Sequence, residues 1–141
     1  MSVPIEISAP LFTTDLSRKS VITGRVLSTL AVLFLLFDAI GKLMRPEAVI
    51  KGTAELGWPV SVILPLGIIQ AVLVLLYIVP RTSVFAAILW TGYLGGAVAA
   101  HVRIGNPLFS HILFPTYVAA LLWLGLWLRD RRLRALLPII K

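Results

Sequence analysis

The sequence predicts an all-α integral membrane protein, an antiparallel bundle of four transmembrane helices. Hydrophobic residues make up 59% of the 141 residues and charged residues only 13%, about half the share that is usual in soluble domains. The apolar residues form four runs, each near the roughly 20 residues that a helix needs to cross a bilayer. Basic residues lie at the ends of these runs, so the net charge of +7 indicates membrane topology and not a nucleic-acid partner.

The four spans are separated by segments rich in helix-breaking residues. The spans are expected at about residues 22–43, 58–79, 83–101 and 112–128. Pro46 and Gly57 lie between the first two, Pro80 begins a tight turn, and Asn106-Pro107 marks the last connection. Short connections between long apolar helices favour antiparallel neighbours.

The distribution of basic residues predicts the orientation. An even number of spans places both termini on one side of the membrane, together with most of the basic residues. That side would hold Arg18, Lys19, Arg25, Arg81, Arg129, Arg131, Arg132, Arg134 and Lys141. The other side would hold Lys42, Arg45, Lys51 and Arg103. The positive-inside rule therefore predicts a cytoplasmic N-terminal segment (1–21), a transmembrane domain (22–128) and a basic cytoplasmic tail (129–141).

Small residues in the third span predict close helix packing. Gly92, Gly96 and Ala100 recur every four residues, which lets another helix approach closely. We expect this stripe to pack against the first or second span, and a seam between two copies of the chain is the alternative. Trp90 is expected to pack between helices, and Pro65 is expected to kink the second span.

Ionisable and amide groups inside apolar runs need an explanation. In "FDAIGKLMRP", Asp38 and Lys42 lie four residues apart and can pair on one helix face. Lysine can also extend to the interface as an anchor, but the short side chain of Asp38 must find a partner inside the bundle. That partner is Lys42, or His101 across the bundle. Gln70 lies near mid-span, where its amide needs partners as well.

Polar residues toward one side of the membrane suggest an outward-opening pocket between the spans. The candidates are Asp38, Lys42, Glu55, Gln70, Tyr93, His101, Arg103 and His111. Asp38 and Gln70 are the strongest because of their depth. His101 and His111 are separated by a proline-containing loop and show no paired-ligand spacing, so we predict no metal site and disfavour haem. The chain has no cysteine, which excludes thiolate metal sites and covalent c-type haem.

Three stretches carry a family resemblance. They are "FDAIGKL" (37–43), "ELGWP" (55–59) and "LYIVPRTSVFAAILWTGYLGGAVAAHVRIGNP" (76–107). The pattern is a Gly-Lys end to the first span, a Gly-Trp-Pro start to the second, a Pro-Arg-Thr turn, and Gly-Ala-x-x-x-His near the end of the third. In this order it resembles the DoxX-like family of small bacterial four-helix membrane proteins, over about residues 22–128. The resemblance implies a location in the bacterial inner membrane.

The resemblance also bears on function. The name-giving relatives are membrane subunits of a thiosulfate:quinone oxidoreductase, and other members are linked to redox stress or quinone handling. The family often has an acidic residue in the middle of the second span, where this chain has Gln70. This departure, together with the absence of cysteine, argues against direct sulfur chemistry and thiosulfate oxidation.

Three functions remain open, and the sequence does not decide whether the protein is an enzyme. The first is a quinone-linked redox component, in which Gln70, Tyr93 and His101 bind the quinone while Asp38 or Lys42 manages protons. The second is a non-enzymatic membrane subunit or adaptor that binds a lipid, a partner membrane or redox protein, or a second copy of itself. The third is an oligomeric small-molecule transporter, because four short helices seldom enclose a pathway alone.

Overall fold

The computed structural model describes residues 16–137 of the chain. Most of the predicted N-terminal segment and the end of the predicted tail lie outside the described residues. The elements follow one another as α1 (Arg18–Met44), α2 (Glu47–Glu55), η1 (Val60–Val62), α3 (Ile63–Ile78), α4 (Ser83–Arg103), η2 (Leu108–Ile112), α5 (Phe114–Arg129) and α6 (Arg131–Leu136). Here η1 is a 3₁₀ turn and η2 a π-helical turn.

The predicted all-α class and the four membrane-spanning helices are confirmed. Four helices are long and apolar enough to cross a membrane, namely Arg18–Met44, Val60–Ile78, Ser83–Arg103 and Leu108–Arg129. The first begins four residues before its predicted start because Ser17 caps it, accepting a hydrogen bond from the Ser20 amide at 3.2 Å. Large apolar side chains such as Phe37 (77% exposed) and Leu75 (65% exposed) lie on the outside, as a lipid-facing surface requires.

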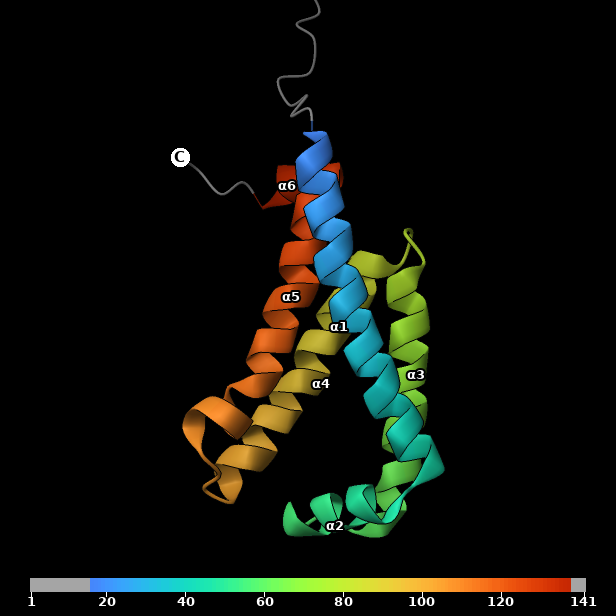
Figure 1. The fold of residues 1–141 in the computed structure, drawn as a ribbon, viewed down its shortest axis with the longest axis vertical. Coiled ribbons are helices and arrows are strands. Elements are labelled where there is room, and N and C mark those ends of the chain that lie inside the picture. The colour runs from blue at the N-terminus through green and yellow to red at the C-terminus, as the bar shows by residue number, and fades with distance from the viewer. Residues whose placement is uncertain (1–15, 138–141) are drawn as a thin grey trace, which may run out of the picture.

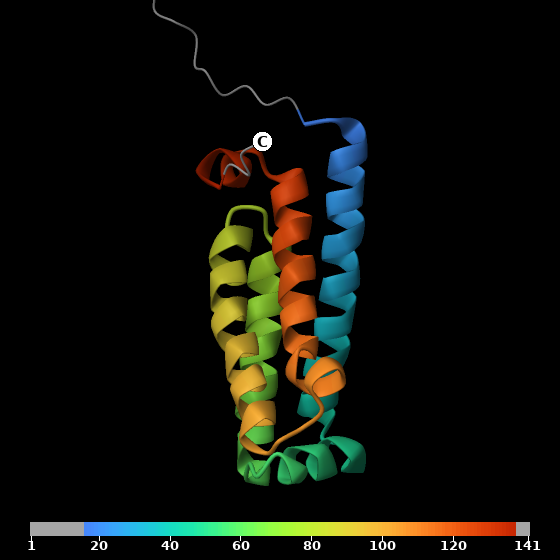
Figure 2. The same ribbon diagram turned by 90° about the vertical axis from the view of Figure 1, so that its left-hand side faces the viewer.

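The four long helices form a closed ring. α1 packs against α3 and α5, and α4 packs against the same two helices. The start of α1 lies at the same end of the bundle as α6, and α2 lies at the opposite end (Figures 1 and 2). These are termed the α6 end and the α2 end below. The turn between α3 and α4 is at the α6 end, so the long helices run alternately up and down.

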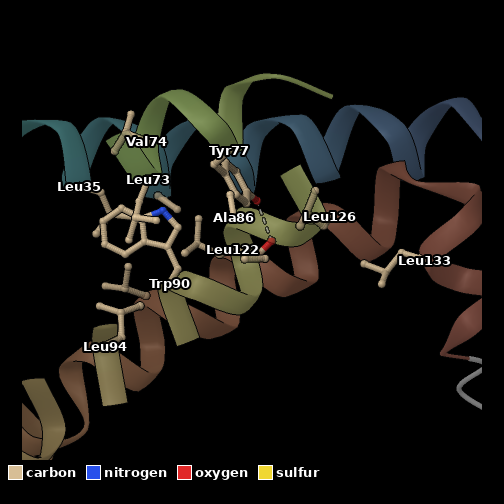
Figure 3. Packing of buried hydrophobic residues seen from close by; sticks show 13 residues of the cluster. Leu35, Leu73, Val74, Tyr77, Ala86, Trp90, Leu94, Leu122, Leu126 and Leu133 are labelled. Carbon is tan, nitrogen blue, oxygen red and sulfur yellow. Dashed lines mark hydrogen bonds between the residues drawn. The ribbon is translucent and has the colours of Figure 1, made fainter. Parts of the chain in front are cut away.

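The α6 half of the bundle is closely packed. A methyl group added at Gly24 of α1 would lie 2.7 Å from the carbonyl oxygen of Gly125 in α5, so the two backbones meet with no room for a side chain. Nearby, the buried Tyr77 hydroxyl donates to the Leu122 carbonyl at 2.7 Å (Figure 3) and lies 3.2 Å from Ser28 Oγ. One tyrosine of α3 thereby links α1 and α5.

Trp90 occupies the centre of the ring, as its depth in the third span predicted. Its side chain is fully buried among Leu35, Leu73 and Leu94 (Figure 3). The ring of Tyr93 meets it edge-on, with centroids 5.5 Å apart.

The predicted packing of the Gly92, Gly96 and Ala100 stripe against the first or second span of the same chain needs correction. A methyl group added at Gly92 or Gly96 would meet nothing within 4 Å, so no described helix lies close against them. α3 and α4 diverge from their turn toward the α2 end (Figure 1), which removes the neighbour that the stripe was expected to contact. Close approach occurs at Gly24, Gly125 and Gly67 instead.

Pro65, the predicted site of a kink, lies at the start of α3 and not in its interior. Pro65 is the third residue of α3, within the first turn, where the backbone amide has no intrahelical acceptor in any case. Proline therefore costs this helix no hydrogen bond. The 3₁₀ turn Val60–Val62 leads directly into α3.

The connection after the first span contains a helix that the sequence analysis treated as a loop. Arg45 adopts a left-handed conformation (φ 53°) and ends α1, and Pro46 then precedes α2. Glu47 occupies the first turn of α2, where a negative charge is favourable, and pairs with Lys51 at 2.8 Å. α2 lies crosswise to the long helices at its end of the bundle (Figure 1).

Candidate functional site

A cavity of about 790 Å³ lies in the α2 half of the bundle. Its volume falls within the roughly 300–1,000 Å³ typical of small-molecule sites. All four long helices and α2 contribute to its lining, which is mostly apolar. The polar side chains that line it are Asp38, Lys42, Thr53, Ser61, Gln70, Tyr93 and His101.

Asp38 is held by two donors from two helices. Its Oδ2 accepts a hydrogen bond from Lys42 Nζ on the same helix and another from Gln70 Nε2 of α3 at 2.6 Å. Asp38 and Lys42 are one helical turn apart, which brings them to one face. The partner left open by the sequence is therefore Lys42, with Gln70 in addition, and not His101. Asp38 and Gln70 were each predicted to need a hydrogen-bond partner inside the bundle, and they are partners of each other.

The orientation of Gln70 leaves an acceptor unused. A carboxylate only accepts hydrogen bonds, so the amide nitrogen must face Asp38. The amide oxygen Oε1 then lies buried with no hydrogen-bond partner among residues 16–137. Gln70 as a whole is 1% exposed. Buried polar atoms without a partner are uncommon in proteins, and this one belongs to a residue that lines the cavity.

α4 supplies the polar groups of the facing wall. Tyr93 and His101 both line the cavity, about two helical turns apart. Nδ1 of His101 lies 2.7 Å from Nδ2 of Asn106. With that amide nitrogen as the donor, Nδ1 is the acceptor and the ring proton of neutral His101 is on Nε2. The wall opposite Asp38 thus carries a phenol and an imidazole N–H.

The other three predicted pocket residues do not line the cavity. Glu55 is exposed at the end of α2. His111 is exposed, lies 2.8 Å from Ser110 Oγ through Nδ1, and meets the His101 ring edge-on at 5.8 Å. Arg103 donates from Nη2 to the Leu56 carbonyl at 2.5 Å. The two histidines do approach each other, but no group of three potential ligands among His, Asp and Glu occurs in the described chain.

The aromatic residues that line the cavity were not predicted from the sequence. Phe34 of α1 and Phe114 of α5 both line it and meet edge-to-face, with ring centroids 5.2 Å apart. Trp58, of the "ELGWP" stretch, lines it as well. Apolar side chains are common on every lipid-facing span, so no pattern in the sequence distinguishes these rings. Thr53 lies on α2, whose helix was not predicted.

Residues 26–125 match the sequence profile of the DoxX-like family. The chain belongs to the DoxX-like family. Every residue that lines the cavity falls within the matched region. Searches of curated proteins and of solved structures gave no significant match. With its four membrane-length helices, this DoxX-like protein is a multi-pass membrane protein.

Proposed function

We propose that this DoxX-like protein binds a membrane quinone in the cavity of the α2 half and acts as a quinone-linked component of the bacterial inner membrane. One observation carries the proposal: a mostly apolar cavity of about 790 Å³ concentrates its ionisable groups and its one buried amide on two facing walls. Quinones need such a site, an apolar slot with a few polar groups that orient the ring.

Both redox forms of a quinone find suitable partners on these walls. The carbonyl oxygens of a quinone accept hydrogen bonds, and Lys42, Tyr93 and His101 offer donors. The hydroxyl groups of a quinol donate hydrogen bonds, and the Asp38 carboxylate offers an acceptor. A site with both kinds of group can hold the ring through a change of redox state.

The ion pair suits the proton balance of quinone chemistry. Reduction of a quinone to a quinol takes up two electrons and two protons. Asp38 and Lys42 lie next to each other at the cavity wall, where they can hold a proton close to the ring and pass it on. The electrons would come from, or go to, a partner redox protein in the membrane.

The test begins with protein purified gently from its native membrane. Mass spectrometry of the co-purified small molecules is expected to find quinone in stoichiometric amount. A ubiquinone or menaquinone analogue added to quinone-depleted protein should quench tryptophan fluorescence, because Trp58 lines the cavity. Phospholipid as the only stoichiometric small molecule, with no quenching by either analogue, would contradict the proposal and support the lipid-binding or adaptor function.

A matched pair of α4 variants locates the binding site. Ala97 lines the cavity, whereas Ala99 on the same helix is exposed and does not. Ala97→Phe should fill part of the cavity and weaken quinone binding at least tenfold. Ala99→Phe adds the same ring to the outer face and should bind as the unmodified protein does. Equal affinities in the two variants would place the quinone outside the cavity.

We propose further that both termini face the cytoplasm. Residues 16–137 place the start of α1 and α6 at one end of the bundle (Figure 1). Most basic residues of the chain lie at this end, which supports a cytoplasmic location. A C-terminal fusion to a reporter that is active only in the cytoplasm should be active, and activity of a periplasm-specific reporter would overturn the orientation.

A further inference from the structure

Side chains obstruct the cavity on two of its sides. On the side between α1 and α5, Phe34 and Phe114 meet edge-to-face at 5.2 Å. Each is still about two-fifths exposed on its outer face (41% and 42%) while it lines the cavity. The pair therefore forms an aromatic barrier between the cavity and the surface on that side.

At the α2 end, the cavity is obstructed by a contact between the end of α4 and the segment that follows α2. Arg103, in the last turn of α4, reaches the Leu56 carbonyl after α2 at 2.5 Å, and its guanidinium lies 5.7 Å from the centre of the Trp58 ring. Gly57 makes this possible: it has φ +71°, and an added methyl group would lie 2.9 Å from Arg103 Nη2. Arg103 and Trp58, with α2 beneath them, cover the end that faces water.

The third side, between α3 and α4, has no such barrier. Thr91 of α4 faces α5, since its hydroxyl accepts a hydrogen bond from Trp123 Nε1 at 2.8 Å. Residues of an α-helix are about 100° apart, so Gly92, Gly96 and Ala100 lie progressively farther around the helix from Thr91. Gly92 and Gly96 are exposed and also line the cavity. At these two positions the cavity wall consists of helix backbone without a side chain.

The facing edge is formed by the start of α3 and by η1, the 3₁₀ turn that precedes it. Ser61 and Pro65 are exposed and line the cavity. Both side chains are short, and neither makes a hydrogen bond or ring contact across to α4 within the described residues. The surface of these helices is otherwise covered by large apolar side chains, such as Leu75 and Phe85.

We propose that this gap, bounded by Ser61 of η1 and Pro65 of α3 on one side and by Gly92 and Gly96 of α4 on the other, is a lateral portal between the bilayer and the cavity. Its ligand is an amphiphile dissolved in the membrane, with one polar head and a long apolar chain. The head reaches Gln70 and Asp38, and the chain leaves over the two glycines into the lipid. The portal rests on the proposed quinone function and adds the route and the need for a chain.

The geometry explains why the small-residue stripe has no neighbour. Side chains at Gly92 and Gly96 would narrow the gap, whereas glycine leaves space for a chain to lie against the helix backbone. Gly95 provides a contrast, since it is also exposed with nothing within 4 Å of an added methyl group but does not line the cavity. Only the glycines at the gap can affect a ligand that passes through it.

The test compares two quinones and two variants, with the full chain in nanodiscs. One quinone carries a long isoprenoid chain and the other has none. In Gly92→Phe, the affinity for the long-chain quinone should fall at least tenfold more than the affinity for the chainless quinone. Gly95→Phe should show no such difference. Equal losses for both quinones in Gly92→Phe, or no loss for either, would overturn the portal.

A photolabel separates failure of the portal from failure of the proposed function. A quinone with a diazirine on its chain should label peptides of α3 and α4 around Pro65 and Gly92. Labelling around Phe34 and Phe114, or only around α2, would show that quinone binds but enters elsewhere, which refutes the portal and leaves the function intact. If the unmodified protein binds neither quinone, the function fails and the portal with it.

Discussion

The two halves of this helix bundle are built from the same four helices and differ in how closely those helices approach. At the α6 half, Gly24 and Gly125 bring two backbones into contact, and Tyr77 ties three helices together. At the α2 half, the helices diverge around a cavity, and glycines on α4 have no neighbour at all. One half provides stability, and the other exposes polar groups that a fully packed core would not need.

The comparison teaches that glycine has opposite effects at different places in one bundle. Gly24 and Gly125 in the α6 half permit close contact between helices, and so does Gly67 where α3 meets the end of α1, whereas Gly92 and Gly96 on α4 border a gap. The same residue type at helical spacing therefore predicts neither use by itself. What decides is whether a second helix lies opposite, which depends on the direction of the helix axes.

The largest expected effect comes from exchanging glycine for alanine in both halves. Gly24→Ala or Gly125→Ala should lower the free energy of unfolding by about 1–3 kcal/mol, since the added methyl group has no space. Gly92→Ala or Gly96→Ala should raise it by up to about 1 kcal/mol, because alanine favours the helix and meets nothing. Unfolding in mixed detergent micelles, followed by circular dichroism, measures both. Changes of the same sign in the two halves would contradict the contrast.

An intermediate effect is expected from removing one buried polar group in each half. Tyr77→Phe removes the hydrogen bond to the Leu122 carbonyl and the contact with Ser28, and should lower the free energy of unfolding by about 1 kcal/mol. Gln70→Leu removes the hydrogen bond from Gln70 Nε2 to Asp38. It also removes a buried oxygen that has no partner among the described residues, so the free energy of unfolding should change less than in Tyr77→Phe. Quinone affinity should show the reverse order, with the larger loss in Gln70→Leu.

The matched control for that pair is the combination of Tyr77→Phe with Ser28→Ala. If the Ser28 contact contributes, the two losses of stability will be less than additive. Quinone affinity in this double variant should match that of the unmodified protein, because neither residue lines the cavity. A loss of affinity as large as that in Gln70→Leu would show that the two halves are not independent.

The smallest effect is expected from exchanging the ion pair. Lys42→Asp alone places like charges four residues apart, which should lower the free energy of unfolding by about 0.5 kcal/mol. Asp38→Lys should lower it further, because it also removes the acceptor of the Gln70 Nε2 hydrogen bond. The double exchange restores opposite charges and should recover part of that loss. Unfolding of all four proteins gives the coupling energy. A double variant no more stable than either single variant would show that Asp38 and Lys42 are not coupled.

Features that depend on one segment at a time could be predicted from the sequence. The four spans follow from run length and composition, and the burial of Trp90 follows from its depth. The pairing of Asp38 with Lys42 was one of two predicted alternatives, and it depends on helical periodicity within α1. The resemblance to the DoxX-like family also came from short local stretches, and the family profile confirms it over residues 26–125.

Features that depend on how segments lie relative to one another could not be predicted from the sequence. The sequence placed eight polar residues near one pocket, and the structure brings five of them to the cavity, Asp38, Lys42, Gln70, Tyr93 and His101. Glu55, Arg103 and His111 lie toward the same end of the bundle as these five, but their side chains do not line the cavity. Depth along a span can be counted in residues, whereas the direction of a side chain around the bundle depends on its neighbours.

The sequence by itself thus determined that this chain crosses a membrane four times, because hydrophobic length is a property of each segment. Only the tertiary structure decided that Gly24 and Gly125 meet while Gly92 and Gly96 border a cavity. Helix crossing angles arise from the packing of all four surfaces together. A difference of direction between two helices opens or closes space far from their point of contact, and no local pattern of residues records it.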